Sequence, residues 1–265
     1  LIKNIRPPFG CVGISVEASH ADNAEFIAAL KSGASFIYVR DVKSRVLLAE
    51  SPKVLVGPDL SYLYPFDPVE VVDDETCGVN LRSWHPYNVE YGSGLYKWLI
   101  YLGKKLPNFQ RYYPFPTWQP QKLVSVLRDR FSFVQPVPLY TEAGRKTDTD
   151  VLAQYFSNIP VAFSPDLFGG LRYFVGMRLH SLIFASQMGI PFLSLSYQPK
   201  NNEFCRAVGL DCSVSLFDLS VLPEKLNYLK TNHARIREYL LEFTRQQNSL
   251  AWEAMRNVSE RILAP

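Results

Sequence analysis

FVGMRLHSLIFASQMGIPFLSLSYQPK, the stretch from Phe174 to Lys200, decides how this chain folds. No charged side chain occurs between Ser181 and Pro199, so most of the stretch must be buried. Gly189 and Pro191 interrupt this apolar run, and residues of these two types are typical of a turn. The pattern therefore predicts a buried helix, a turn and a buried strand, and not one membrane-spanning helix.

Strand and helix patterns alternate along the chain up to this stretch. The predicted strands are Cys11–Val16, Ser35–Val39, Val54–Val56, Gly78–Leu81, Phe131–Pro136, Tyr173–Val175 and Phe192–Leu195. The predicted helices are Asn23–Lys31, Val42–Ala49, Gly92–Leu102, Gln119–Asp129, Asp148–Phe156, a short one near Asp166, one from Leu179, and a long tail from Glu224 to Ile262 with a bend or break. Nearly continuous apolar strands that alternate with helices indicate an α/β fold with parallel sheets covered on both faces.

The segment Tyr62–Val69, YLYPFDPV, divides the chain, because its prolines interrupt both helix and strand. We expect a Rossmann-like N-terminal domain over residues 1–66 and a Rossmann-like C-terminal domain with the helical tail over residues 67–265. Residues 1–57 contain three predicted strands, whereas sheets commonly have about 4–6. The chain also begins with Leu1 and not with Met. We therefore expect the N-terminal domain to be truncated, or to be a trimmed form.

Composition excludes several classes of function. Of the 265 residues 47% are hydrophobic and 20% charged, as in an ordinary soluble globular protein. The net charge of +3 is too small to argue for nucleic acid, but it agrees with a local anion site. The four cysteines form no C-x-x-C pair, so we expect reduced thiols in a cytoplasmic protein and no metal site.

Cationic and titratable residues follow two of the predicted strands. Arg178 and His180 come after the strand Tyr173–Val175, and Lys200 comes after the strand Phe192–Leu195. In a parallel α/β sheet ligands bind at the carboxyl ends of the strands, where helix N-termini and arginines attract phosphate. The three residues therefore predict an anion site, although Arg178 in a surface salt bridge and His180 as a helix cap would explain each residue alone.

Two further arginines have the same position in their own strand–helix units. Arg40 follows the strand Ser35–Val39, and Arg82 follows the strand Gly78–Leu81. Asp41 and Ser44, which come after Arg40, are expected to shape the start of the next helix. Trp84 and His85, beyond Arg82, are candidate acceptor-binding residues, with packing as the alternative.

Four segments resemble the polysaccharide pyruvyl transferase family. RLHSLIFASQMGIPFLSLSYQPK strongly resembles the family's C-terminal signature. YVRDVKS, the Gly57-Pro58-Asp59 strand end and GVNLRSW are similar to its R-D-x-x-S segment, to the strand that follows, and to the strand that opens its second domain. The resemblance spans roughly Val12 to Ile262. The glycine-rich G-x-x-N-x-G-D-like segment with which family members usually begin has no match here.

The resemblance implies two glycosyltransferase-B-like Rossmann domains with the site between them. It implies phosphoenolpyruvate as the donor and a sugar in a polysaccharide, or in its lipid-linked precursor, as the acceptor. Arg178, His180 and Lys200 match family site positions, and Arg40 matches less closely. Arg178, Lys200 and one or both of Arg40 and Arg82 would balance the nearly three negative charges of phosphoenolpyruvate. A histidine can donate the proton that ketal formation needs, so His180 is the predicted general acid.

Two other functions remain open at this point. A nucleotide-sugar-dependent glycosyltransferase of the same architecture would need a carboxylate on the ribose, for which Glu203 is the nearest candidate. A non-catalytic sugar-binding module would use Trp84, Trp98 and the Tyr112–Phe115 run as stacking platforms. For the pyruvyl transferase we expect no cofactor besides the donor substrate, no nucleic-acid partner, no transmembrane segment, and a location in the cytoplasm or at the periphery of the membrane.

Overall fold

The chain divides into two compact units. The computed structural model describes residues 9–16, 24–48, 51–64, 66–70, 75–82, 118–142, 147–197 and 199–263. Unit 1 comprises Leu1–Pro65 with Glu242–Pro265, and unit 2 comprises Phe66–Leu241. The division at Pro65 falls inside the predicted linker. It differs from the predicted domains at the C-terminal end, which groups with unit 1 because Val258 is buried against Phe36 and Tyr38.

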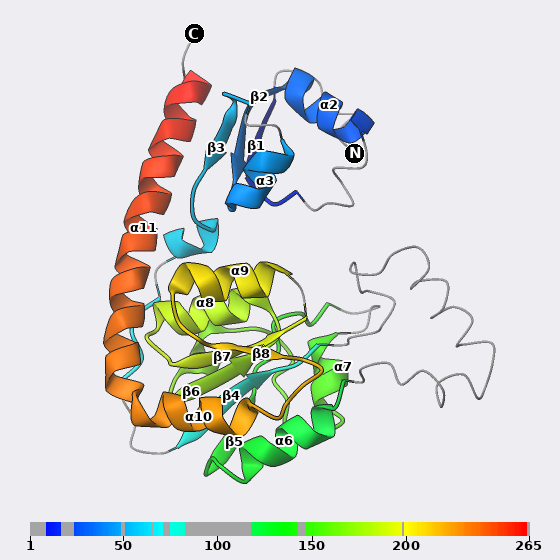
Figure 1. Ribbon diagram of the computed structural model, residues 1–265, viewed down its shortest axis with the longest axis vertical. Helices are drawn as coiled ribbons and strands as arrows, with labels where there is room; N and C mark the ends of the chain where they lie inside the picture. The colour runs from blue at the N-terminus through cyan, green and yellow to red at the C-terminus, as the bar shows by residue number, and fades with distance from the viewer. Residues whose placement is uncertain are drawn as a thin grey trace, which may run out of the picture. The chain divides into compact units, whose positions relative to one another are not determined.

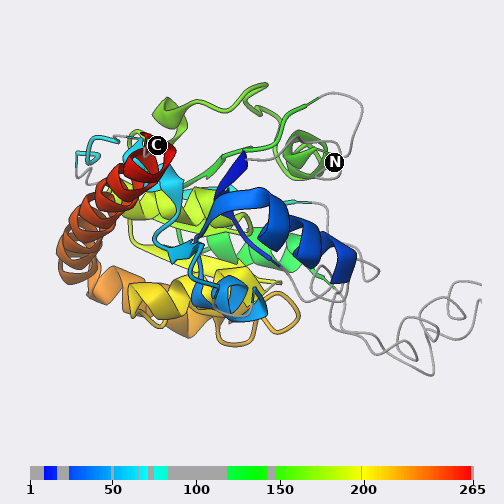
Figure 2. The same cartoon turned by 90° about the horizontal axis from the view of Figure 1, so that it is seen from above.

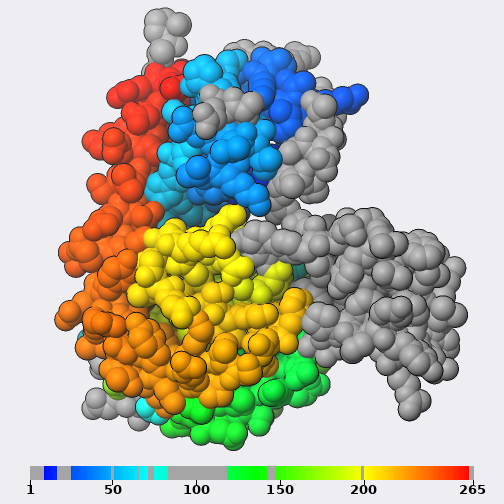
Figure 3. Space-filling model, in the orientation of Figure 1, coloured from blue at the N-terminus to red at the C-terminus, as the bar shows by residue number. Residues whose placement is uncertain are grey.

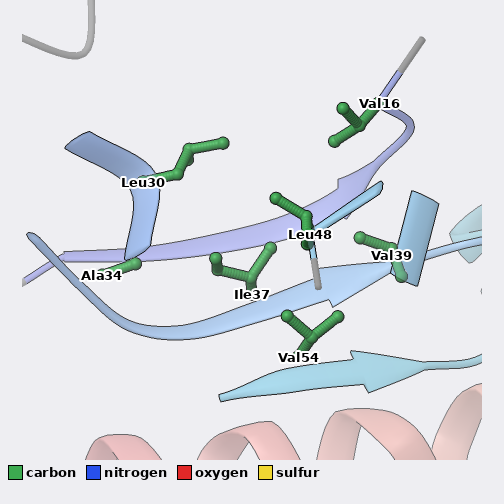
Figure 4. Close-up of a cluster of buried hydrophobic side chains, with 7 residues drawn as sticks. All are labelled: Val16, Leu30, Ala34, Ile37, Val39, Leu48 and Val54. Atoms are coloured by element: carbon green, nitrogen blue, oxygen red, sulfur yellow. The ribbon is translucent and has the colours of Figure 1, made fainter. Parts of the chain in front are cut away.

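Unit 1 is built on a three-stranded parallel sheet. Its strands β1 (Phe9–Ile14), β2 (Ala34–Val39) and β3 (Val54–Val56) are arranged in the order β1-β2-β3, and its helices include α2 (Ala24–Gly33) and α3 (Val42–Leu47). Side chains of a strand alternate between the two faces of its sheet. Ile37 and Val39 of β2 therefore belong to the cluster in Figure 4, together with Leu30 and Leu48. Phe36 and Tyr38 point to the other face, which the C-terminal helix α11 (His233–Leu263) covers.

Unit 2 contains a five-stranded sheet in which every strand pair is parallel. Its strands are β4 (Thr76–Asn80), β5 (Phe133–Pro136), β6 (Tyr173–Gly176), β7 (Phe192–Ser196) and β8 (Ser213–Ser215), in the order β5-β4-β6-β7-β8. Its helices include α6 (Pro120–Arg128), α7 (Asp148–Leu152), α8 (Leu179–Gln187), α9 (Pro199–Val208) and α10 (Leu222–Thr231). Figure 1 shows α8 and α9 on one side of the sheet and α6 and α10 on the other. Every residue of β6 and β7 is buried, as the double covering requires.

The helix, turn and strand predicted for the Phe174–Lys200 stretch are confirmed by α8 and β7. Gly189 has a positive φ of 69° and ends α8. Its N–H donates to the carbonyl of Ser186 at 3.1 Å, and the N–H of Ile190 donates to that of Ala185 at 2.8 Å. These two hydrogen bonds form a Schellman motif, in which glycine is favoured because it has no Cβ. Among the described residues, no helix is long and apolar enough to cross a membrane.

The predicted break in the helical tail is also confirmed, since α10 ends at Thr231 and α11 begins at His233. Figure 2 shows the two as separate helices, and in Figure 3 the outer side of α11 lies at the surface. The sequence analysis did not predict α9 or β8, and it made α7 four residues too long at its end. The predicted helix Gly92–Leu102 lies outside the described residues.

Candidate active site

The order of the strands in unit 2 indicates where a ligand would bind. The chain runs from β4 to β5 on one side and then returns to β6 on the other, so the direction of winding reverses between β4 and β6. In open α/β sheets, ligands bind outside the carboxyl ends of the strands at this switch point. Asn80 and Gly176, the last residues of the two strands, lie next to each other in register. Arg82 and Arg178 each follow two residues later, so these two of the three sequence-predicted arginines lie at the switch point.

Asn80 connects the two strand ends. Its side chain is completely buried. Its Oδ1 accepts a hydrogen bond from the backbone N–H of Arg178 at 3.1 Å, while its Nδ2 donates to Asp148 Oδ2 at 3.1 Å and to the carbonyl of Val137 at 2.9 Å. Because this buried amide makes three hydrogen bonds, it holds the backbone N–H of Arg178 in a fixed position.

Arg178 forms a buried ion pair with Asp148. Its Nε donates to both carboxylate oxygens, at 2.9 and 2.7 Å, and its Nη2 donates to Oδ1 at 2.6 Å. The Asp148 side chain is 0% exposed and that of Arg178 is 25% exposed. The backbone N–H groups of Leu139 and Tyr140 each donate to Asp148 Oδ2 at 3.1 Å. Bidentate pairing of this kind holds the guanidinium in one orientation. Asp148 also neutralises part of the positive charge of Arg178, which the sequence analysis expected to pair with a bound anion.

Arg82 is held by a residue from a third strand end. Its Nη1 donates to the hydroxyl of Tyr197 at 2.7 Å, and its guanidinium lies 5.1 Å from the centre of the Tyr197 ring. Tyr197 comes directly after β7. The backbone N–H of Arg82 also contacts Met177 Sδ at 3.4 Å, in the loop after β6. The carboxyl ends of β4, β6 and β7 thus each contribute a side chain or loop to this edge.

His180 and Lys200 lie in the first turns of α8 and α9, and therefore at the same edge of the sheet. His180 is exposed, and its ring lies nearly parallel to that of Phe184, with 23° between the planes and 6.3 Å between the centroids. Lys200 is partly exposed. Its neighbour Asn201 is buried and donates through Nδ2 to the carbonyl of Met177 at 2.7 Å, which ties the first turn of α9 to the loop that precedes Arg178.

Arg40 belongs to unit 1 and is already paired there. Its Nε donates to Ser15 Oγ at 2.7 Å and its Nη1 donates to Asp59 Oδ2 at 2.7 Å. Asp41 accepts a hydrogen bond from the backbone N–H of Ser44 at 2.7 Å and caps α3, as the sequence predicted. Trp84 and His85 lie outside the described residues. Within the part of the chain that is described, no cluster of three or more His, Cys, Asp or Glu side chains could hold a metal ion.

The family model of polysaccharide pyruvyl transferases matches residues 1–199, which is most of the 265-residue chain. The chain belongs to the polysaccharide pyruvyl transferase family. The matched segment includes Arg82, Arg178 and His180 and ends one residue before Lys200. A comparison with curated proteins found no relative that matches.

Two solved structures show the fold class of this pyruvyl transferase family member. A protein from Listeria monocytogenes described as a UDP-N-acetylglucosamine 2-epimerase has a TM-score of 0.56 at 11% identity, over 97% of this chain and 69% of that one. Anabaena Alr3699/HepE, solved in complex with UDP and glucose, has a TM-score of 0.50 at 11% identity, over 95% of this chain and 71% of that one. At this identity the likeness concerns the fold alone. It confirms the predicted glycosyltransferase-B-like α/β class with parallel sheets.

Three residues that contact the arginines of this edge, namely Asn80, Asp148 and Tyr197, were missed from the sequence. The sequence analysis placed Asp148 only at the start of the predicted helix Asp148–Phe156. The helix start is in fact satisfied by a capping box, in which Thr147 Oγ1 accepts from the N–H of Asp150 and the Asp150 carboxylate accepts from the N–H of Thr147. Because the T-x-x-D pattern provides this cap, the carboxylate of Asp148 is available for another partner. The T-x-x-D pattern is visible in the sequence and could have indicated this.

Proposed function

We propose that this protein transfers the pyruvyl group of phosphoenolpyruvate onto two hydroxyls of one sugar and so forms a pyruvate ketal in a polysaccharide or its lipid-linked precursor. The supporting observation is the placement of Arg82 and the Asp148-paired Arg178 at the switch point of unit 2, directly before the helix that carries His180. The family supplies the class of reaction, and these residues supply the binding and proton transfer that it needs.

The donor would bind through its two anionic groups. Phosphoenolpyruvate carries a phosphate and a carboxylate, and Arg82, Arg178 and Lys200 all come from the carboxyl edge of the sheet. Arg178 is the N-cap of α8, and its side chain makes no capping hydrogen bond. The first N–H groups of α8 therefore add to the positive end of the helix, which favours a phosphate. Asp148 and Tyr197 hold the two arginines in position before the donor arrives, which reduces the entropy lost on binding.

His180 would act as the general acid. Protonation of the methylene carbon C3 converts the enol phosphate to an oxocarbenium ion at C2, and a sugar hydroxyl adds to C2 and releases its proton. Phosphate then leaves, and a second hydroxyl closes the ketal with loss of its own proton. The net reaction consumes one donor and one diol and releases one phosphate. His180 is exposed and can therefore reach a bound substrate, and its contact with the Phe184 ring restrains its orientation.

Isotope incorporation tests this assignment. In D₂O the wild type should place one deuterium in the pyruvyl methyl group, which mass spectrometry of the product reads directly. His180→Gln should lower turnover about 100-fold or more, the usual scale for a general acid, with little change in melting temperature because the side chain is exposed. His233→Gln serves as the control, because it removes a histidine that packs against Tyr173. Its turnover per folded molecule should equal that of the wild type. Near-wild-type turnover by His180→Gln would refute the assignment.

A binding experiment distinguishes the donor from a nucleotide sugar. Phosphoenolpyruvate should raise the melting temperature of the wild type, and Arg178→Lys should weaken this effect because a lysine cannot reproduce the bidentate contact with Asp148. Stabilisation by UDP but not by phosphoenolpyruvate would instead favour a nucleotide-sugar-dependent glycosyltransferase. In that case the role assigned to Arg82 and Arg178 would be wrong.

A further inference from the structure

Unit 1 contains a groove of its own, separate from the residues of the proposed donor site. It has a volume of about 420 Å³ and lies between the carboxyl ends of β2 and β3 and the helix α11, which Figure 1 shows beside β3. This volume falls within the range of ~300–1,000 Å³ typical of small-molecule sites. The lining residues on which the argument depends are Arg40, Pro58, Gln247, Leu250, Glu253 and Asn257.

The α11 residues of this groove lie along one side of the helix. Gln247, Leu250 and Asn257 are three and seven residues apart, and residues at such spacings share a face of a helix. Among the residues that the structure describes, the side chains of Gln247, Glu253 and Asn257 make no hydrogen bond or ion pair, and those of Glu253 and Asn257 are exposed. Two amides, a carboxylate and the apolar Leu250 therefore line one wall and can meet a ligand without breaking an existing contact.

The charges of the groove limit the chemistry of that ligand. The opposite wall carries Arg40, whose guanidinium is paired with Asp59 at 2.7 Å and hydrogen-bonded to Ser15 at 2.7 Å. Because that pair is nearly neutral, Glu253 makes the local charge negative. A phosphate or a carboxylate would be repelled here. The groove therefore differs in its ligand chemistry from the phosphoenolpyruvate site to which the sequence analysis assigned Arg40.

We propose that this groove binds a neutral sugar unit. The two amides can donate to and accept from sugar hydroxyls, and the carboxylate can accept from them. The Leu250 side chain, which is 48% exposed, offers an apolar surface to the C–H face of a pyranose ring. The sugar belongs to the acceptor glycan, a statement that rests on the proposed function. Arg40 is then a sugar-site residue that Asp59 positions, and not a donor ligand.

Saturation-transfer NMR of the full chain tests the proposal with a panel of methyl glycosides of glucose, galactose, mannose and N-acetylglucosamine. At least one glycoside should receive saturation from the wild type. Glu253→Gln and Asn257→Ala should each raise its Kd about 5- to 10-fold, the effect of losing one hydrogen bond. Glu260→Gln, an equal change of charge at an exposed position of the same helix outside the groove, should leave the Kd unchanged.

Three results would overturn the proposal: no glycoside binds, the two groove variants bind as the wild type does, or Glu253→Gln strengthens the binding of inorganic phosphate measured by ³¹P line broadening. The last result would make the groove an anion site. Deuterium uptake and phosphate release from phosphoenolpyruvate, measured on the same proteins, separate this proposal from the proposed function. Turnover without glycoside binding in the groove would refute the groove alone, and glycoside binding without turnover would refute the proposed reaction alone.

Discussion

Replacing Asp148 with asparagine tests the ion pair that organises the proposed donor site. The Asp148 side chain is 0% exposed. All the groups that hydrogen-bond to its two oxygens are donors: the guanidinium of Arg178, the amide of Asn80, and the backbone N–H groups of Leu139 and Tyr140. An asparagine has nearly the same shape, but its NH₂ group would face a donor in either orientation. The substitution therefore removes the negative charge and also leaves buried donors unsatisfied.

The size of the effect follows from the burial of the pair. Removing one partner of a buried ion pair costs about 3–5 kcal/mol. The Arg178 side chain is 25% exposed, and water can partly solvate the unpaired guanidinium, so we expect the lower end, about 3 kcal/mol. For a unit of this size, about 2–4 °C of melting temperature is lost per kcal/mol. Asp148→Asn should therefore lower the melting temperature of unit 2 by about 6–12 °C.

Asp150→Asn provides the matched control for this measurement. It makes the same change two residues away in α7, at an exposed side chain that caps the N–H of Thr147 at 2.8 Å, and should cost about 1 kcal/mol or less. Thermal unfolding followed by circular dichroism compares both variants with the wild type. If Asp148→Asn destabilises the protein no more than Asp150→Asn does, then the ion pair does not hold Arg178 in solution and the reasoning on the site is wrong.

Three more changes test other parts of the structure. Tyr197→Phe removes the 2.7 Å hydrogen bond to Arg82 and should raise the KM for phosphoenolpyruvate about 10-fold with a smaller effect on kcat; an unchanged KM in steady-state kinetics would exclude Arg82 as a donor ligand. Gly189→Ala places a Cβ at a φ of 69° and should cost about 1–2 kcal/mol in urea unfolding, whereas an unchanged midpoint would contradict the Schellman turn. Burial, and next the charge of Arg172, lower the pKa of His233, so the neutral form is favoured in the folded state. The contribution of neutral His233 to the free energy of unfolding is complete above the unfolded pKa of about 6.5. It is lost as the pH falls through the lower pKa of the folded state. His233→Phe should flatten the fall of the unfolding free energy below pH 6.5, and an unaltered pH profile would refute this role.

The sequence by itself determined the kinds and order of most elements, because periodicity and turn chemistry are local properties. The strand Val54–Val56 and the helix from Leu179 were predicted at their observed starts. Helix α9 was missed because its first turn contains a proline and two asparagines, residue types that are typical of turns. Strand β8 was missed because it is three residues long with a serine at each end. Such weak patterns become a helix and a strand through their packing against β7.

Tertiary structure decided which residues meet. The sequence placed Arg178 at a strand end, since parallel strands bring their carboxyl ends to one edge, and this prediction holds. Its partner Asp148 lies 30 residues away and Asn80 lies 98 residues away, and their meeting depends on the order β5-β4-β6, which no local pattern encodes. The same is true of the tail, where Val258 joins unit 1 because it is buried against strand β2 of that unit. Local patterns specify elements, whereas the burial of apolar faces over long sequence separations specifies their partners.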